Sequence, residues 1–212
     1  MRLHFPSLAA KALCAALAAA ALAGCAPLLI GGAAVGAMMA TDRRTSGAQI
    51  DDEAIELRAG ARMRESFGDN AHISVNSYNR QVLLTGEVPS EAVKQQAEQL
   101  AGRVENVRAV INELAVMPAT TLPQRSNDVL VTGKVRASFV DASELQANAF
   151  RVVTERGTVY LMGRVTQAEA DRATQITRQI PGVQRVVRIF ELVQAADVRP
   201  ATVASPAASA PR

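Results

Sequence analysis

The spacing of hydrophobic positions changes along the first half of the chain and predicts a succession of elements. Between Asp52 and Phe67 the apolar residues recur at helical spacing and share one face: Ile55, Ala59, Met63 and Phe67. Asp51 or Asp52 is the expected N-cap of this helix, because a short acidic side chain can accept from the first free backbone N–H groups. The first element is therefore predicted to be an amphipathic helix.

A different period follows the helix. Residues 72–77 alternate between polar and apolar, as a half-buried strand does, and Asn79-Arg80 is the expected turn before an apolar strand at 82–88. A helix from Pro89-Ser90 to about Arg103 and a strand at 108–116 complete the unit. The predicted order is helix, strand, strand, helix, strand.

The same plan recurs 77 positions later. The segment VLLTGEV at 82–88 reappears as VYLMGRV at 159–165, which places Gly86 and Gly163 at equivalent positions. We expect both glycines to be structural, at points where close packing or an unusual backbone excludes a side chain. In the second copy Gly157 marks the hairpin turn, and Pro181-Gly182 ends the second helix.

These units predict an α+β protein with two tandem domains, each a small three-stranded mixed sheet with two helices on one face. The expected domains span 49–117 and 126–196, with a linker at 118–125 that contains two prolines. Residues 197–212 are rich in Pro, Ala and Ser and are expected to form a disordered tail.

The N-terminus carries a targeting pattern. A basic start and an alanine-rich apolar run lead to Leu22-Ala23-Gly24-Cys25, which resembles a bacterial lipobox. The resemblance implies that residues 1–24 are a signal peptide, that Cys25 is acylated with palmitate-type chains, and that 25–48 form a tether. Ala26 after the cysteine favours the periplasmic face of the outer membrane. A transmembrane helix, or a plain signal peptide with a structural cysteine, is the alternative.

Charge and residue chemistry narrow the function. Residues 50–117 are rich in acids and residues 126–196 in arginine, which favours an anionic partner for the second half. His72 is the single histidine after residue 24, so we expect no metal site, no cofactor and no catalytic constellation. Nucleic acid is not an expected partner for an exported chain.

The repeated strand ending in glycine, together with PGVQRV at 181–186, resembles the BON-domain family, although the first unit has Glu105-Asn106-Val107 in place of Pro-Gly-Val. The lipoprotein start followed by two such units is similar to outer-membrane members of that family. The resemblance implies binding of anionic phospholipid, such as phosphatidylglycerol or cardiolipin, through the first helix of the second domain. It also implies support of outer-membrane integrity at division sites and a contact with outer-membrane assembly machinery.

The residues of that helix fit the implied role. Its outer face is expected to carry Leu130, Lys134 and Ala137, flanked by Gly133 and Val140, with Arg136 off this stripe but near it. Such an apolar surface with basic neighbours can enter a headgroup layer. A tryptophan stands in the family's lipid-binding protein where this chain has Leu130. Two alternatives stay open: the helix merely covers the sheet, or the protein is an envelope-stress scaffold or holdase-like factor without direct lipid recognition.

Overall fold

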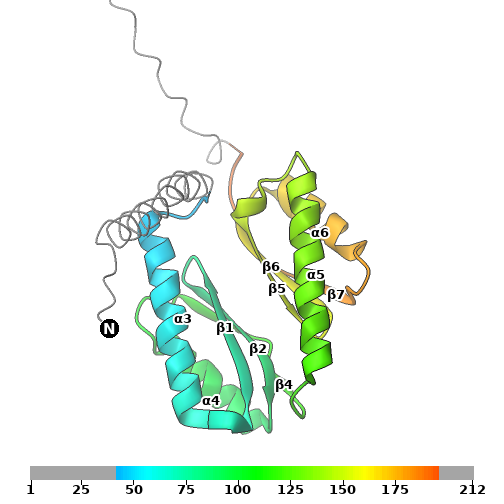
Figure 1. The fold of residues 1–212 in the computed structure, drawn as a ribbon. Helices are drawn as coiled ribbons and strands as arrows, with labels where there is room; N and C mark the ends of the chain where they lie inside the picture. The colour runs from blue at the N-terminus through cyan, green and yellow to red at the C-terminus, as the bar shows by residue number, and fades with distance from the viewer. Residues whose placement is uncertain (1–41, 196–212) are drawn as a thin grey trace, which may run out of the picture. The chain divides into compact units, whose positions relative to one another are not determined.

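The computed structural model describes residues 42–195, which form two successive α+β domains (Figure 1). In the first domain β1 and β2 form an antiparallel hairpin, and the third strand returns parallel to β2 through α4. Its elements are α3 (Ser46–Phe67), a 3₁₀ turn (Gly68–Asn70), β1 (His72–Tyr78), β2 (Gln81–Val88), α4 (Glu91–Gly102), β3 (Ala109–Asn112) and β4 (Ala115–Val116).

The second domain repeats this topology. Strand β6 is central, with β5 antiparallel on one side and β7 parallel on the other. Its elements are α5 (Leu122–Asp141), a 3₁₀ turn (Ala147–Ala149), β5 (Phe150–Glu155), β6 (Thr158–Val165), α6 (Gln167–Arg178) and β7 (Arg185–Leu192). The predicted fold class, with mixed sheets and two helices per domain, is confirmed.

Two predicted helix boundaries are wrong for local reasons. Helix α3 begins at Ser46, inside the expected tether, because the Thr45 hydroxyl accepts from the Ala48 N–H, so neither Asp51 nor Asp52 is the N-cap. Helix α5 begins at Leu122, inside the expected linker, behind a capping box of Thr121 and Gln124.

The third predicted strand of the first domain is also interrupted. The expected continuous strand at 108–116 is split into β3 and β4, which pair with successive parts of β2. Between them the side chain of Asn112 accepts from the N–H of Leu114, and Leu114 turns into the core. A local side-chain hydrogen bond therefore replaces part of the strand ladder.

Each domain buries one face of its sheet under its helices. The opposite faces of the two sheets share a smaller apolar cluster of Tyr78, Leu83, Tyr160 and Met162. Ion pairs surround this cluster, including Arg151–Glu56 at 2.8 Å and Arg185–Glu113 at 2.8 Å. Within residues 42–195, no helix is long and apolar enough to cross a membrane.

Candidate functional site: the outer face of helix α5

Helix α5 is fixed to its domain by a buried stripe. Val131, Val135 and Phe139 are at most 1% exposed and pack against the sheet, and the Phe139 ring lies 5.0 Å from that of Phe150. Burying an aliphatic or aromatic side chain of this kind contributes about 1.5–3 kcal/mol. The position and rotation of α5 are therefore set by core packing, and its opposite face is free for another role.

A buried aspartate adds a polar attachment. The Asp128 carboxylate accepts from the backbone N–H groups of Arg156 and Gly157, at 2.8 and 2.9 Å. These two residues form the β5–β6 turn and both have positive φ, as a tight primed hairpin turn requires. The aspartate thus joins the helix to the hairpin and satisfies two N–H groups that would otherwise lack partners.

The first domain uses the same device. Asp52, 1% exposed, lies inside α3 and accepts from the N–H groups of Asn79 and Arg80, each at 2.7 Å. From the sequence Asp52 was expected only as a cap, so this role was missed. A sign of it was present, because an aspartate stands in each first helix at nearly the repeat distance, ahead of each hairpin turn.

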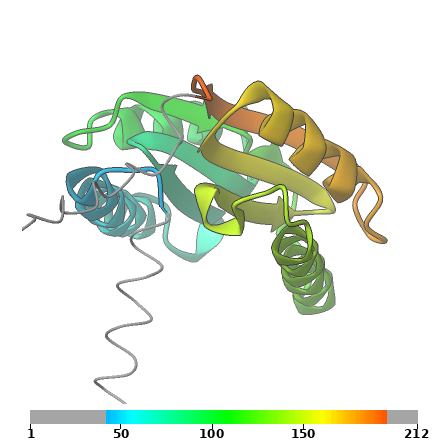
Figure 2. The same cartoon turned by 90° about the horizontal axis from the view of Figure 1, so that it is seen from above.

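The five predicted lipid-binding residues are all exposed and lie on one side of α5. Figure 2 shows this helix in green at the edge of the second domain. Leu130 is 63% exposed, and a Cβ added at Gly133 would meet no atom within 4 Å. Val129 and Val140, each 71% exposed, lie on the same side and extend the stripe beyond these five residues.

Two cations flank this apolar stripe. At 100° per residue Lys134 lies on one edge of the stripe and Arg136 on the other, with the apolar residues between them. Both are exposed, and neither forms a hydrogen bond or an ion pair within the described part of the chain. We call the surface formed by Val129, Leu130, Gly133, Lys134, Arg136, Ala137 and Val140 the α5 outer face.

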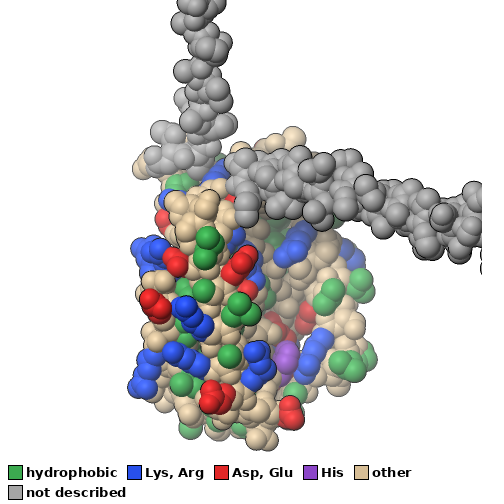
Figure 3. All heavy atoms as spheres, turned by 60° about the vertical axis from the view of Figure 1, so that its left-hand side comes forward, with side chains coloured by type: hydrophobic (Ala, Val, Ile, Leu, Met, Phe, Trp, Pro, Cys, Tyr) green, Lys and Arg blue, Asp and Glu red, His purple; other side chains and the backbone are tan. Residues whose placement is uncertain are grey.

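The corresponding helix of the first domain has a different surface. When Asp52 is matched to Asp128, the counterparts of Val129 and Leu130 are Glu53 and Ala54. Leu57 is 72% exposed on α3, but acids and bases surround it, and Figure 3 shows both signs of charge interspersed on the side that carries α3. An uninterrupted apolar stripe is therefore a property of α5 and not of α3.

The two repeat glycines lie at close backbone approaches. A Cβ at Gly86, where φ is +117°, would lie 2.0 Å from the carbonyl oxygen of His72. A Cβ at Gly163 would lie 2.5 Å from the carbonyl oxygen of Ala149. Both sites exclude a side chain by contact with a neighbouring strand or turn, which supports a structural role.

The segment that precedes α3 is attached to the second domain. The Arg43 guanidinium donates to both carboxylate oxygens of Glu169, at 2.7 and 2.8 Å, and to the carbonyl oxygen of Arg164. Because of the hydrogen bonds from Arg43, and despite burial, the pKa of Glu169 is lowered to about 2. Cys25, the predicted anchor, and the predicted tail at 197–212 lie outside the described residues.

Comparison with known proteins agrees with this architecture. The BON-domain family model matches twice, at residues 51–118 and 127–194. The chain is 41% identical to the outer membrane lipoprotein DolP of Haemophilus influenzae over 172 residues, 80% of this chain and 89% of that protein. It is 32% identical to a 21 kDa hemolysin of Actinobacillus pleuropneumoniae, over 72% of this chain and 80% of the hemolysin.

A more distant relative is the osmotically-inducible protein Y of Escherichia coli, 30% identical over 65% of this chain and 70% of that protein. The two family matches coincide with the two observed domains. The chain therefore belongs to the BON-domain family, as a two-domain protein similar to the lipoprotein DolP.

Proposed function

We propose that this protein is a lipid-anchored component of the outer membrane, facing the periplasm, that binds anionic phospholipid through the α5 outer face and supports membrane integrity. The observation that carries the proposal is the exposed apolar stripe from Val129 to Val140 on α5. It lies between two cations that form no ion pair within residues 42–195. The similarity to DolP over most of both chains supports the outer-membrane location. The lipobox at Cys25 supports the anchor.

The energetics fit a contact that depends on tethering. Transfer of Leu130 from water to an apolar layer is worth up to about 2 kcal/mol, and the two valines add less each. Lys134 and Arg136 contribute about 1 kcal/mol each near an anionic surface. The total gives weak binding in free solution, which an acyl anchor strengthens by raising the local concentration of the domain at the membrane.

Vesicle flotation tests this proposal. The chain from residue 25 to 212 with Cys25→Ser, which lacks acyl chains, is mixed with three kinds of vesicle. One is pure phosphatidylcholine, the second contains added phosphatidylglycerol, and the third contains added cardiolipin. We expect binding only to the anionic vesicles, and binding that falls with salt. Leu130→Glu places a charge in the stripe and is expected to lower the partition coefficient at least ten-fold, equivalent to about 1.4 kcal/mol.

Leu57→Glu is the matched control, because Leu57 is similarly exposed on the equivalent helix of the first domain. We expect it to bind as the parent does. Equal flotation with neutral and anionic vesicles contradicts recognition of anionic lipid. An equal loss of vesicle binding in Leu130→Glu and Leu57→Glu contradicts it as well. In that case a crosslink from α5 to a single envelope protein would favour the scaffold function instead.

A further inference from the structure

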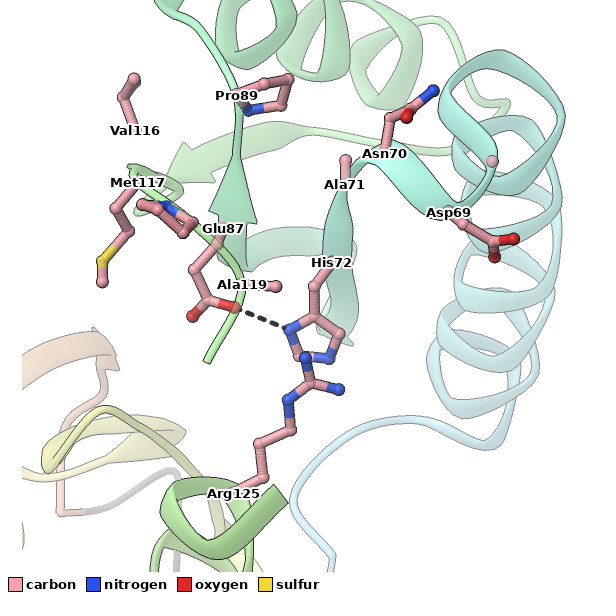
Figure 4. Close-up of a pocket in the computed structure, with 12 residues that line it drawn as sticks. Asp69, Asn70, Ala71, His72, Glu87, Pro89, Val116, Met117, Ala119 and Arg125 are labelled. Carbon is pink, nitrogen blue, oxygen red and sulfur yellow. Dashed lines mark hydrogen bonds and ion pairs between the residues drawn. The ribbon is translucent and has the colours of Figure 1, made fainter. Parts of the chain in front are cut away.

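A compact group of metal-ligating side chains lies where the two domains meet. His72 at the start of β1, Glu87 near the end of β2 and Glu155 at the end of β5 each present a ligand atom, and these atoms lie within 4.8 Å of one another. Figure 4 shows the His72 and Glu87 side chains pointing toward one another. Both residues line a hollow of about 600 Å³. The group is independent of the α5 outer face.

Glu87 is held in place by several hydrogen bonds. Its Oε1 accepts from Arg156 at 2.7 Å, and its Oε2 accepts from the Thr120 N–H and hydroxyl and lies 3.2 Å from His72 Nδ1. Burial opposes its ionisation, but the hydrogen bonds from Thr120 and Arg156 outweigh it, so the pKa of Glu87 is lowered. Arg156 thus pairs with one Glu87 oxygen, and His72 lies beside the other.

Glu155 is not held by hydrogen bonds in this way, although the charges of His72 and Arg156 act on it. It is 6% exposed, and within residues 42–195 its carboxylate makes no hydrogen bond or ion pair. Burial and the neighbouring charge of Glu87 raise its pKa. A largely buried carboxylate without a hydrogen-bond donor is uncommon in native proteins, and coordination of a cation is one way in which proteins compensate its charge.

We propose that Glu155, Glu87 and His72 bind one divalent transition-metal ion, with Zn²⁺ the best match. One imidazole nitrogen and two carboxylate oxygens are ligands that Zn²⁺ accepts at about 2.0–2.2 Å. Two ligands on a tetrahedral ion with such bonds stand about 3.4 Å apart, close to the 3.2 Å between His72 Nδ1 and Glu87 Oε2.

Binding changes the hydrogen bonds locally. His72 Nδ1 gives up its contact with Glu87 and offers a lone pair, so the ring proton resides on Nε2. The fourth position opens to the hollow lined by Asp69, Asn70 and Met117, through which solvent can enter. Arg156 and Arg125 place positive charge nearby, so we expect moderate affinity and not the very tight binding of an all-cysteine site.

The ion would join the two domains, since His72 and Glu87 belong to the first and Glu155 to the second. A metal ion that binds the folded chain and not the unfolded chain raises the free energy of unfolding by mass action. Zn²⁺ is therefore expected to raise the temperature of unfolding, in addition to titrating with one ion per chain.

Isothermal titration of Zn²⁺ into the tag-free chain 25–212 with Cys25→Ser tests the site. This chain has no thiol, and His72 is its single histidine. Co²⁺ is added in parallel, because its visible absorption reports coordination geometry. We expect one saturable Zn²⁺ site, and at least a ten-fold loss of affinity in both Glu155→Gln and His72→Gln.

Glu113→Gln is the matched control, because Glu113 is also a domain-interface carboxylate, paired with Arg185 outside the group. It should leave Zn²⁺ affinity within about two-fold of the parent. The proposal is overturned if the parent shows no saturable binding at micromolar Zn²⁺. It is also overturned if Glu155→Gln and His72→Gln bind Zn²⁺ with the affinity of the parent. A third contrary result is that Glu155→Gln raises the unfolding temperature while Zn²⁺ does not change the unfolding temperature of the parent.

Discussion

The Arg43–Glu169 pair gives a quantitative test of the contacts between the segment before α3 and the second domain. The two side chains are only 11% and 13% exposed, and the pair is bidentate, with N–O distances of 2.7 and 2.8 Å. Replacement by Arg43→Met keeps much of the aliphatic stem and removes the charge. The Thr166 cap, which also donates to Glu169, stays in place.

The magnitude follows from the carboxyl pKa. A pKa lowered from 4.5 to about 2 corresponds to about 3 kcal/mol of stabilisation of the folded state. Hydrogen bonds from Thr166 supply part of this, so we expect Arg43→Met to lower the free energy of unfolding by about 2 kcal/mol at pH 7. Because the folded pKa is depressed, this contribution is present above about pH 4.5 and is lost as the pH falls through about 2.

Urea unfolding followed by far-ultraviolet circular dichroism at pH 7, 4 and 2.5 measures the difference between parent and variant. The difference should shrink at the lowest pH, and what remains reports the hydrogen bond to the carbonyl of Arg164. Arg172→Met is the control, because the Arg172–Glu144 pair is about half exposed, so solvent screens it and its loss should cost much less than that of the Arg43–Glu169 pair. This account of the pair is wrong if Arg43→Met costs no more than the control, or if its cost is the same at pH 7 and pH 2.5.

Three further sites test the core of the second domain by the same urea assay. Asp128→Ala leaves two buried turn N–H groups without an acceptor and should cost about 2–4 kcal/mol; a cost under about 1 kcal/mol would contradict the hairpin attachment. Gly163→Ala drives a methyl group into the Ala149 carbonyl and should cost at least about 2 kcal/mol, whereas its control Gly133→Ala enters open space in a helix and should stabilise by about 0.5–1 kcal/mol. Phe139→Ala should cost about 3–5 kcal/mol, and a much smaller loss would mean that α5 is not held by its buried stripe.

The fold was predictable because its evidence is periodic and repeated. Alternation at 72–77, the apolar strand at 82–88 and a second copy 77 positions on leave little choice of topology. Helix starts were less predictable, because Thr45 and Thr121 cap their helices several residues before the hydrophobic pattern begins. Hydrophobic periodicity shows where a helix is buried, and in the first turns of these two helices Ala48 is the single buried residue, too small to mark the start of the pattern.

The domain interface was beyond sequence reasoning for a different reason. His72 looks isolated along the chain because no second histidine accompanies it, whereas in the fold two glutamates from separate strands gather around it. Glu87 and Glu155 stand near strand ends in different domains, 68 positions apart (155 − 87). Which strand ends meet is decided by how the two sheets pack, and no local pattern encodes that packing.

The two domains are most alike inside and most different on their helix surfaces, and that contrast bears on function. Both have a buried aspartate that joins the first helix to its hairpin, and both have a glycine where the second strand passes a neighbouring carbonyl. The outer faces of the first helices differ, with Glu53 and Ala54 on α3 in place of Val129 and Leu130 on α5. An exposed apolar stripe contributes nothing to folding and adds a risk of aggregation, so it is best explained by contact with a membrane or another protein. The fold does not require an apolar outer face on this helix, since α3 has a polar one in the same position. A function specific to the second domain should therefore be sought at the stripe on α5.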